Sequence, residues 1–137
     1  LQTNKVKFAV QIFDYIHSVD SEKLARKIAD EQSKINKNIK IFLQVNIGNE
    51  YQKSGINKHE TERLVSFSKG IGLNVIGLMC IPPMNIDPEV YFVEMNKLKK
   101  DFGFDELSMG MSSDYILATK HSSTHIRVGS SIFGQRS

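Results

Sequence analysis

Alternation between apolar and polar residues is clearest in the first third of the chain. Ile41, Leu43, Val45 and Ile47 fall on one side of an extended segment, with polar and aromatic residues on the other side. This period of two predicts a β-strand over residues 39–47. Shorter apolar runs predict four more strands, at residues 15–19, 74–80, 107–111 and 124–128.

Helical periodicity separates these strands. A helix is predicted over residues 6–13, and Asp20 is expected to cap a second, with Leu24 and Ile28 one turn apart. Asn57 and Glu60 form a capping-box variant for a third helix, which is expected to end at Gly70. A fourth helix follows the cap Asp87 and Pro88; its expected apolar stripe is Tyr91, Met95, Leu98 and Phe102, and Gly103 ends it.

Strands that alternate with helices, several of them apolar on both faces, predict a parallel sheet covered by helices. Right-handed crossovers leave two architectures: a doubly wound sheet, or part of a (β/α)₈ barrel. The pattern alone does not choose between them. Both place functional residues at the carboxyl ends of the strands.

Composition narrows the function classes. The 137 residues, 40% hydrophobic and 24% charged, suit a single globular domain over residues 1–137, and the net charge is +3. The basic residues are scattered and do not interleave with aromatics, which argues against nucleic-acid binding. The longest apolar run, residues 75–81, is too short to span a membrane. A single cysteine, Cys80, rules out an internal disulfide and suggests a cytoplasmic, reducing compartment.

Two small-residue bends near the C-terminus carry the candidate chemistry. The strand ending at Met111 runs into Ser112-Ser113-Asp114, which is expected to cap the next helix, and the strand containing Arg127 runs into Gly129-Ser130-Ser131. Neighbouring strand ends with helix starts offer backbone N–H groups, hydroxyls and a fixed cation, which together hold a phosphate without a metal. The alternative interpretations are an ordinary turn at Gly129 and a surface salt bridge for Arg127.

Other reactive side chains have simpler interpretations. Lys53 lies in a glycine-containing loop and could form a Schiff base, but a solvated or helix-capping lysine is the expected role. The four histidines share no metal-ligand spacing, so no metal site is predicted and satisfied or surface histidines are expected: His17, His59, His121 and His125. Among the methionines, only Met111 is a candidate for function.

The strings LSMGMSSDYILA and IRVGSSIFGQR resemble the signature of the pyridoxal phosphate homeostasis proteins, which share the fold of the N-terminal domain of alanine racemase. Four further strings match that family in order: LQTNK, FDYIHSVD, LQVNIGNEYQKSGI and GLMCIPP. The resemblance implies that this chain supplies strands four to eight of a (β/α)₈ barrel. The first three strands, and with them the Schiff-base lysine that holds pyridoxal phosphate, have no counterpart in these residues.

The same resemblance implies roles for five residues. Arg127 should approach the pyridine nitrogen of pyridoxal phosphate, and Gly129 and Ser130 should bind its phosphate through N–H groups, and Ser130 also through its hydroxyl. Met111 and Ser112 should line the phosphate from the neighbouring strand end.

The expected function is that of a non-catalytic carrier or buffer of pyridoxal phosphate, with apo-enzymes that need the cofactor as candidate recipients. An amino-acid racemase or decarboxylase is the first alternative. A doubly wound module for another phosphorylated ligand is the second. Five barrel strands would leave two open sheet edges, so we also expect the chain to self-associate.

Overall fold

The computed structural model describes residues 1–135 and contains one sheet of parallel strands. The strands are β1 (Tyr15–Val19), β2 (Lys40–Asn46), β3 (Ile56–Asn57), β4 (Asn74–Met79), β5 (Glu106–Met111) and β6 (His125–Arg127). Their order is β1-β2-β4-β5-β6, with the two-residue β3 paired to β2 beyond the main path. Neighbours thus follow chain order, as in a (β/α)₈ barrel, whereas a doubly wound sheet reverses its order partway.

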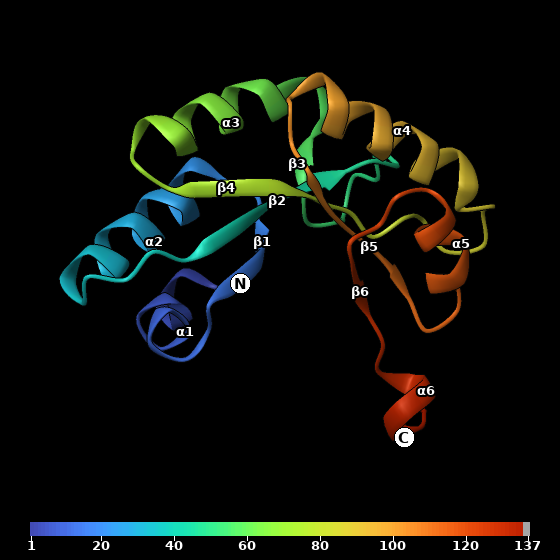
Figure 1. Ribbon diagram of the computed structural model, residues 1–137, viewed down its shortest axis with the longest axis horizontal. Coiled ribbons are helices and arrows are strands. Elements are labelled where there is room, and N and C mark those ends of the chain that lie inside the picture. Colours follow the sequence, from blue (N-terminus) through green and yellow to red (C-terminus); the bar gives the residue numbers. More distant parts are fainter. Residues whose placement is uncertain (136–137) are drawn as a thin grey trace.

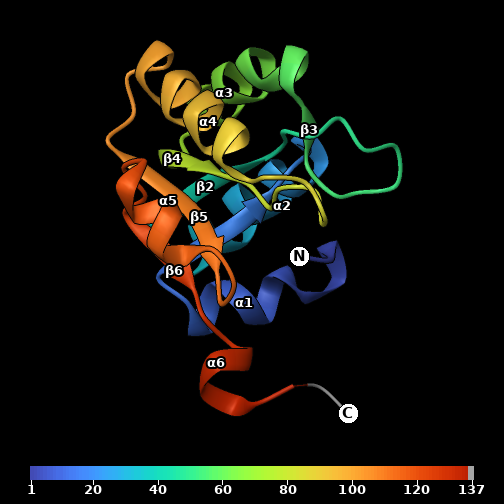
Figure 2. The same ribbon diagram turned by 90° about the vertical axis from the view of Figure 1, so that its right-hand side faces the viewer.

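Helices fill the connections between strands. They are α1 (Val6–Ile12), α2 (Glu22–Lys34), α3 (Thr61–Gly70), α4 (Glu89–Asp101), α5 (Tyr115–Lys120) and α6 (Ser130–Phe133), with 3₁₀ turns η1 (Thr3–Lys5) and η2 (Lys58–Glu60). Figure 1 shows α2, α3, α4 and α5 arranged around one side of the sheet, with α1 beside α2. Both views show α6 projecting beyond the end of β6 (Figures 1 and 2). None of the helices within residues 1–135 has the length and apolarity that a membrane crossing requires.

The sheet is rolled into part of a barrel. Adjacent strands lie about 4.8 Å apart, so a flat sheet would separate β1 from β6 by roughly 19 Å. The rings of Tyr15 on β1 and His125 on β6 instead have centroids 5.7 Å apart. The predicted partial barrel of parallel strands is therefore confirmed, and side chains on the inner face meet across it.

The main core lies between the outer face of the sheet and the helices. Ile41, Leu43 and Val45 of β2 pack there with Leu24 and Ile28 of α2. The inner face of β2 is also covered, because Phe42 and Gln44 are buried. This burial on both faces is the reason that apolar Phe42 stands on the side of the strand that otherwise carries polar residues.

Three local predictions are wrong by one or two residues. Ser21, not Asp20, caps α2 by accepting a hydrogen bond from the Leu24 N–H, and Asp20 instead accepts one from the Gly55 N–H. Gly70 is the last helical residue of α3, and Gly72 takes the left-handed conformation at φ +84°. In α4 the N-cap position falls on Pro88, one residue after the predicted Asp87, whose carboxylate accepts a hydrogen bond from the Glu89 N–H at 3.0 Å. The predicted stripe of α4 does pack against the core, and the fully buried Phe92 joins it.

Candidate functional site

The two serine-bearing bends lie side by side at the carboxyl ends of β5 and β6. These strands are parallel neighbours, and Met111 pairs with Arg127. The Ser112 hydroxyl oxygen accepts hydrogen bonds from the Gly129 N–H at 3.2 Å and from the Ser131 N–H at 3.3 Å. The bends are thus in direct contact, although 17 residues separate Ser112 from Gly129.

A bulge in β5 gives the first bend its geometry. The strand advances three residues between its pairings with His125 and Arg127 while β6 advances two. Gly110 absorbs the extra residue at φ +99°, a conformation that glycine adopts without strain. A Cβ there would lie 2.7 Å from the Ala118 Cβ and 3.0 Å from the Tyr115 Cα, so glycine also lets α5 pack against the strand.

Asp114 stabilises the first bend in a way that the sequence did not predict. Asp114 occupies the N-cap position of α5, within the three residues predicted to cap this helix, but its side chain makes no capping hydrogen bond. The Asp114 carboxylate instead reaches back and accepts a hydrogen bond of 2.7 Å from the Met111 N–H. The Ser112 hydroxyl therefore remains available to accept hydrogen bonds from the second bend.

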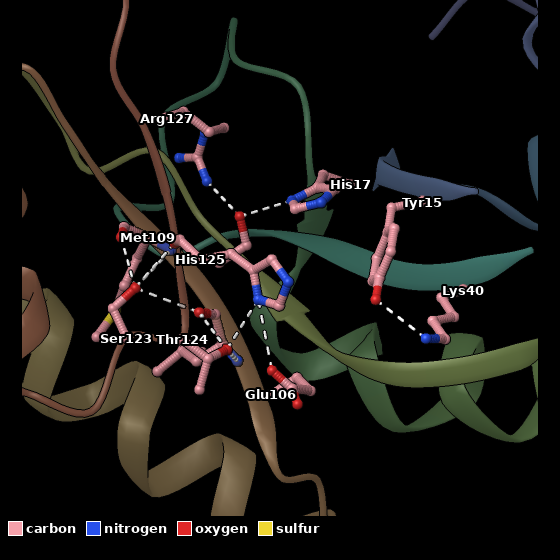
Figure 3. Close-up of polar contacts among 11 residues, drawn as sticks. Tyr15, His17, Lys40, Glu106, Met109, Ser123, Thr124, His125 and Arg127 are labelled. Atoms are coloured by element: carbon pink, nitrogen blue, oxygen red, sulfur yellow. Dashed lines mark hydrogen bonds and ion pairs between the residues drawn. The ribbon is translucent and has the colours of Figure 1, made fainter. Parts of the chain in front are cut away.

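The guanidinium of Arg127 points into the barrel interior and not into solvent. It donates from Nη1 to the Ser108 hydroxyl at 2.5 Å (Figure 3). From Nη2 it donates to the Cys80 carbonyl at 2.8 Å. Burial lowers the pKa of Arg127, opposed by Cys80 and Asp114, and a guanidinium stays protonated even so. Arg127 forms no ion pair with any carboxylate of residues 1–135, so the surface salt bridge is not found.

The structure brings all five predicted site residues to one end of the barrel. Met111 is 39% exposed, Ser112 and Arg127 are half-buried, and Gly129 and Ser130 are exposed. One of the two expected N–H donors already has a partner, because the Gly129 N–H donates to the Ser112 hydroxyl. The Met111 N–H donates to the Asp114 carboxylate. Contact of these residues with a cofactor stays a prediction.

Sequence reasoning missed a group of inner-face residues next to Arg127. The His17 ring stacks on Phe42 with centroids 4.3 Å apart, and its Nδ1 lies 2.8 Å from the Ser108 hydroxyl. Burial, then the nearby His125 and Arg127, lower the pKa of His17 to about 4. The available signal was strand parity, which places the polar side chains of His17 and Ser108 on the inner face of their strands.

The remaining candidates are paired at some distance from the bends. Lys53 forms an ion pair of 2.7 Å with Glu50 in the loop after β2. His125, at the start of β6, contacts the Thr124 hydroxyl at 3.0 Å and the Glu106 carboxylate at 3.4 Å (Figure 3). At the start of β1, the Tyr15 hydroxyl accepts a hydrogen bond from the Lys40 ammonium at 3.0 Å.

Comparisons with known proteins agree with this geometry. The family model of the N-terminal domain of alanine racemase matches residues 1–137. The pyridoxal phosphate homeostasis protein of Aquifex aeolicus is 34% identical, over 99% of this chain and 64% of the relative. Less than two thirds of that relative's length is therefore represented here.

Two solved structures of PipY from Synechococcus elongatus are similar to this chain. The form without pyridoxal phosphate superimposes with a TM-score of 0.85 at 34% identity, over 98% of this chain and 67% of PipY. The form with pyridoxal phosphate bound gives a TM-score of 0.79 at 33% identity, with the same coverage. The similarity extends over both the rolled sheet and the bends.

Proposed function

Because the chain belongs to the alanine racemase N-terminal domain family, and within it to the pyridoxal phosphate homeostasis proteins, we propose that it binds pyridoxal phosphate at the carboxyl ends of β5 and β6. Residues 1–137 would form one domain, the C-terminal part of the barrel. The protein would carry or buffer the cofactor without catalysing a reaction on amino acids.

The observation that carries this proposal is the convergence of two backbone N–H groups on one oxygen. Gly129 and Ser131 both direct their N–H groups at the Ser112 hydroxyl oxygen. That oxygen stands in for an acceptor of the kind that a phosphate supplies. The N–H of Ser130 lies between these two donors in sequence and has no hydrogen-bond partner among residues 1–135. The residues present therefore fit a phosphate ester.

Each proposed site residue has one task. Gly129 and Ser130 would donate N–H groups to the phosphate, and Ser112 would turn its hydroxyl from acceptor to donor as the phosphate takes over its two partners. Met111 would cover the phosphate from the β5 side. Arg127 would direct its cation at the pyridine nitrogen and disfavour protonation of that nitrogen.

The cofactor itself supplies an aldehyde and an electron-withdrawing ring. An arginine beside the ring nitrogen reduces that electron withdrawal, which suits storage better than amino-acid chemistry. The acceptors would be apo-enzymes that require the cofactor, and a cytoplasmic site of action is part of the same proposal.

A binding titration of the 137-residue chain tests the proposal. We expect pyridoxal phosphate to bind, inorganic phosphate to compete with it, and pyridoxal without phosphate to bind at least tenfold more weakly. Ser130→Ala should weaken the binding of pyridoxal phosphate by at least about tenfold, since a hydrogen bond to a charged group contributes about 1.5–3 kcal/mol. Ser66→Ala, an exposed serine of α3, is the matched control.

Two outcomes would overturn the proposal. Equal affinities for pyridoxal and pyridoxal phosphate would show that the protein does not recognise the phosphate group. Turnover of an amino acid upon addition of pyridoxal phosphate would indicate the racemase or decarboxylase alternative.

A further inference from the structure

Three polar side chains on the inner face of the sheet form one continuous line of hydrogen bonds. Arg127 of β6 donates to the Ser108 hydroxyl of β5, and that hydroxyl lies 2.8 Å from Nδ1 of His17 on β1. Figure 3 shows the guanidinium of Arg127 and the ring of His17 pointing toward one another, joined by dashed lines through a single hydroxyl. Because β2 and β4 separate β1 from β5 in the sheet, this line exists only in the rolled sheet.

The donor and acceptor groups of the three side chains determine the direction of each hydrogen bond in this line. A guanidinium only donates, so the Ser108 oxygen accepts from Arg127 and its own proton needs another acceptor. Within residues 1–135 the one acceptor in reach is Nδ1 of His17. His17 must therefore be neutral and carry its proton on Nε2, because protonation at Nδ1 would leave the Ser108 proton, which is fully buried, without a partner.

A second contact fixes the plane of the guanidinium. Nη2 of Arg127 donates to the Cys80 carbonyl at 2.8 Å, while Nη1 is held by Ser108. Two acceptors on two different nitrogens determine both the position and the tilt of a planar group. The other N–H groups of Arg127 remain for a ligand.

We infer that Ser108 and His17 are positioning residues that hold the Arg127 guanidinium in the orientation required by the ring of pyridoxal phosphate. The inference rests on the proposed function for the identity of the ligand. Neither residue is expected to touch the cofactor: Ser108 acts through Arg127, and His17 acts through Ser108.

The surroundings of His17 keep it in the required state. The groups that face it are Phe42 of β2 by stacking, Tyr15 of its own strand, and His125 and Arg127 of β6. The burial of the ring and the positive charge on β6 both disfavour the imidazolium, so the pKa of His17 falls to about 4. His17 is thus an acceptor throughout the neutral range.

The first test needs no cofactor. In ¹H–¹⁵N spectra of the 137-residue chain, His17 should show the Nε2–H tautomer from pH 8 to pH 5, and Arg127 should give a resolved, slowly exchanging guanidinium signal. Ser108→Ala should broaden the Arg127 signal and shift the pKa of His17. Ser68→Ala is the matched control, because Ser68 is equally buried but its hydroxyl has no hydrogen-bond partner among residues 1–135.

A second variant covers the case in which Ser108→Ala does not fold. His17→Phe keeps an aromatic ring against Phe42 and removes only the acceptor, so it should broaden the Arg127 signal less than Ser108→Ala. An Nδ1–H tautomer in the unsubstituted chain, or an unchanged Arg127 signal in a folded Ser108→Ala variant, would overturn the positioning role.

The second test adds pyridoxal phosphate. Ser108→Ala should weaken its binding about three- to tenfold, and Ser68→Ala should leave binding unchanged. In one outcome, the unsubstituted chain binds no pyridoxal phosphate while the Arg127 signal still responds to Ser108→Ala. That result would contradict the proposed function but support the positioning of Arg127 by Ser108. An unaltered affinity in a folded Ser108→Ala variant would overturn the positioning role even though the cofactor binds.

Discussion

The unusual residue of the barrel interior is His17, a half-buried imidazole close to the Arg127 guanidinium and to a second imidazole, that of His125. Its neighbours His125 and Arg127 both lie on β6, and the ring stacks on Phe42. With a pKa lowered from 6.5 to about 4, His17 binds a proton in the unfolded chain at pH values where the folded chain leaves it neutral. His17 therefore links folding to pH.

We predict that the chain loses stability as the pH falls from 6.5 to 4. In this window the unfolded state binds more protons than the folded state, so the free energy of unfolding rises with pH. The loss of stability that His17 causes reaches its full size below pH 4. After allowance for the solvent that reaches the ring, the loss is about 2 kcal/mol. Urea unfolding at half-unit pH steps measures it.

His17→Phe should flatten this pH dependence, because phenylalanine has no proton to bind in either state. His59→Gln is the control, since His59 is an exposed histidine on η2, away from the barrel interior. A slope that His17→Phe leaves unaltered would assign the pH dependence to other groups.

At the scale of elements, the bulge in β5 determines where the first bend lies. Gly110 has φ +99°, and its Cα faces Ala118 and Tyr115 of α5 at distances that leave no room for a methyl group. The bulge turns Ser112 toward Gly129 and Ser131. The glycine thus connects the packing of a helix to the geometry of the two serine-bearing bends.

We predict that Gly110→Ala destabilises the chain by about 2–4 kcal/mol, from left-handed backbone strain and overlap with Ala118 together. The same substitution should weaken the binding of pyridoxal phosphate, because it would move Ser112. Thermal or urea unfolding measures the first effect and a binding titration the second.

Gly70→Ala provides a matched control for this prediction. Gly70 is helical, lies at the end of α3 and has no atom within 4 Å of an added Cβ. Alanine should stabilise the chain there by about 0.5 kcal/mol, because it restricts the unfolded chain and suits a helix. A similar loss at both glycines would mean that the bulge carries no special strain.

The sequence predicted the elements well because each is governed by local periodicity. The alternation around Ile41 and Leu43 and the spacing of Leu24 and Ile28 are properties of single strands and helices, and the structure confirms both. The site was harder to predict, because His17 and Ser108 meet across two intervening strands. Their contact depends on the curvature of the sheet, which no local pattern encodes.

The resemblance to the pyridoxal phosphate homeostasis proteins supplied two predictions that the hydrophobic periodicity could not. It selected the barrel over the doubly wound sheet, and it assigned Arg127 to the pyridine nitrogen of pyridoxal phosphate rather than to a surface carboxylate. It did not reveal that Ser112 accepts the Gly129 N–H, since this contact depends on side-chain orientation within each bend. Local capping was misassigned for the same reason, as Asp20 and Ser21 both suit an N-cap by type.

At the scale of the whole molecule, the described sheet has two open edges. β1 pairs only with β2 and β6 only with β5, so each presents backbone groups that no strand satisfies. Apolar side chains are exposed close to the first edge, where Phe8 and Ile12 of α1 are 61% and 69% exposed and Phe13 is 54% exposed. Ile132 and Phe133 of α6 are exposed beyond the second edge.

Open edges beside exposed apolar side chains lead us to predict that the 137-residue chain self-associates. Pairing with a second chain satisfies edge N–H and C=O groups and removes apolar surface from water, so both contributions favour association. Size-exclusion chromatography with light scattering over a concentration series measures the mass. A single monomeric peak at every concentration, with one cooperative unfolding transition, would contradict the prediction.

The charge variant Phe8→Lys with Ile12→Lys separates the edge from the general apolar surface. Both substitutions lie on the exposed side of α1 and should shift the equilibrium toward the monomer, because association would then bring like charges together and bury them. Val90→Lys with Val93→Lys on α4 is the control, since these side chains are 59% and 52% exposed but lie on the helix-covered side of the sheet. If both pairs of substitutions dissolve the assembly equally, association follows from apolar surface in general and the open edge has no special part in it.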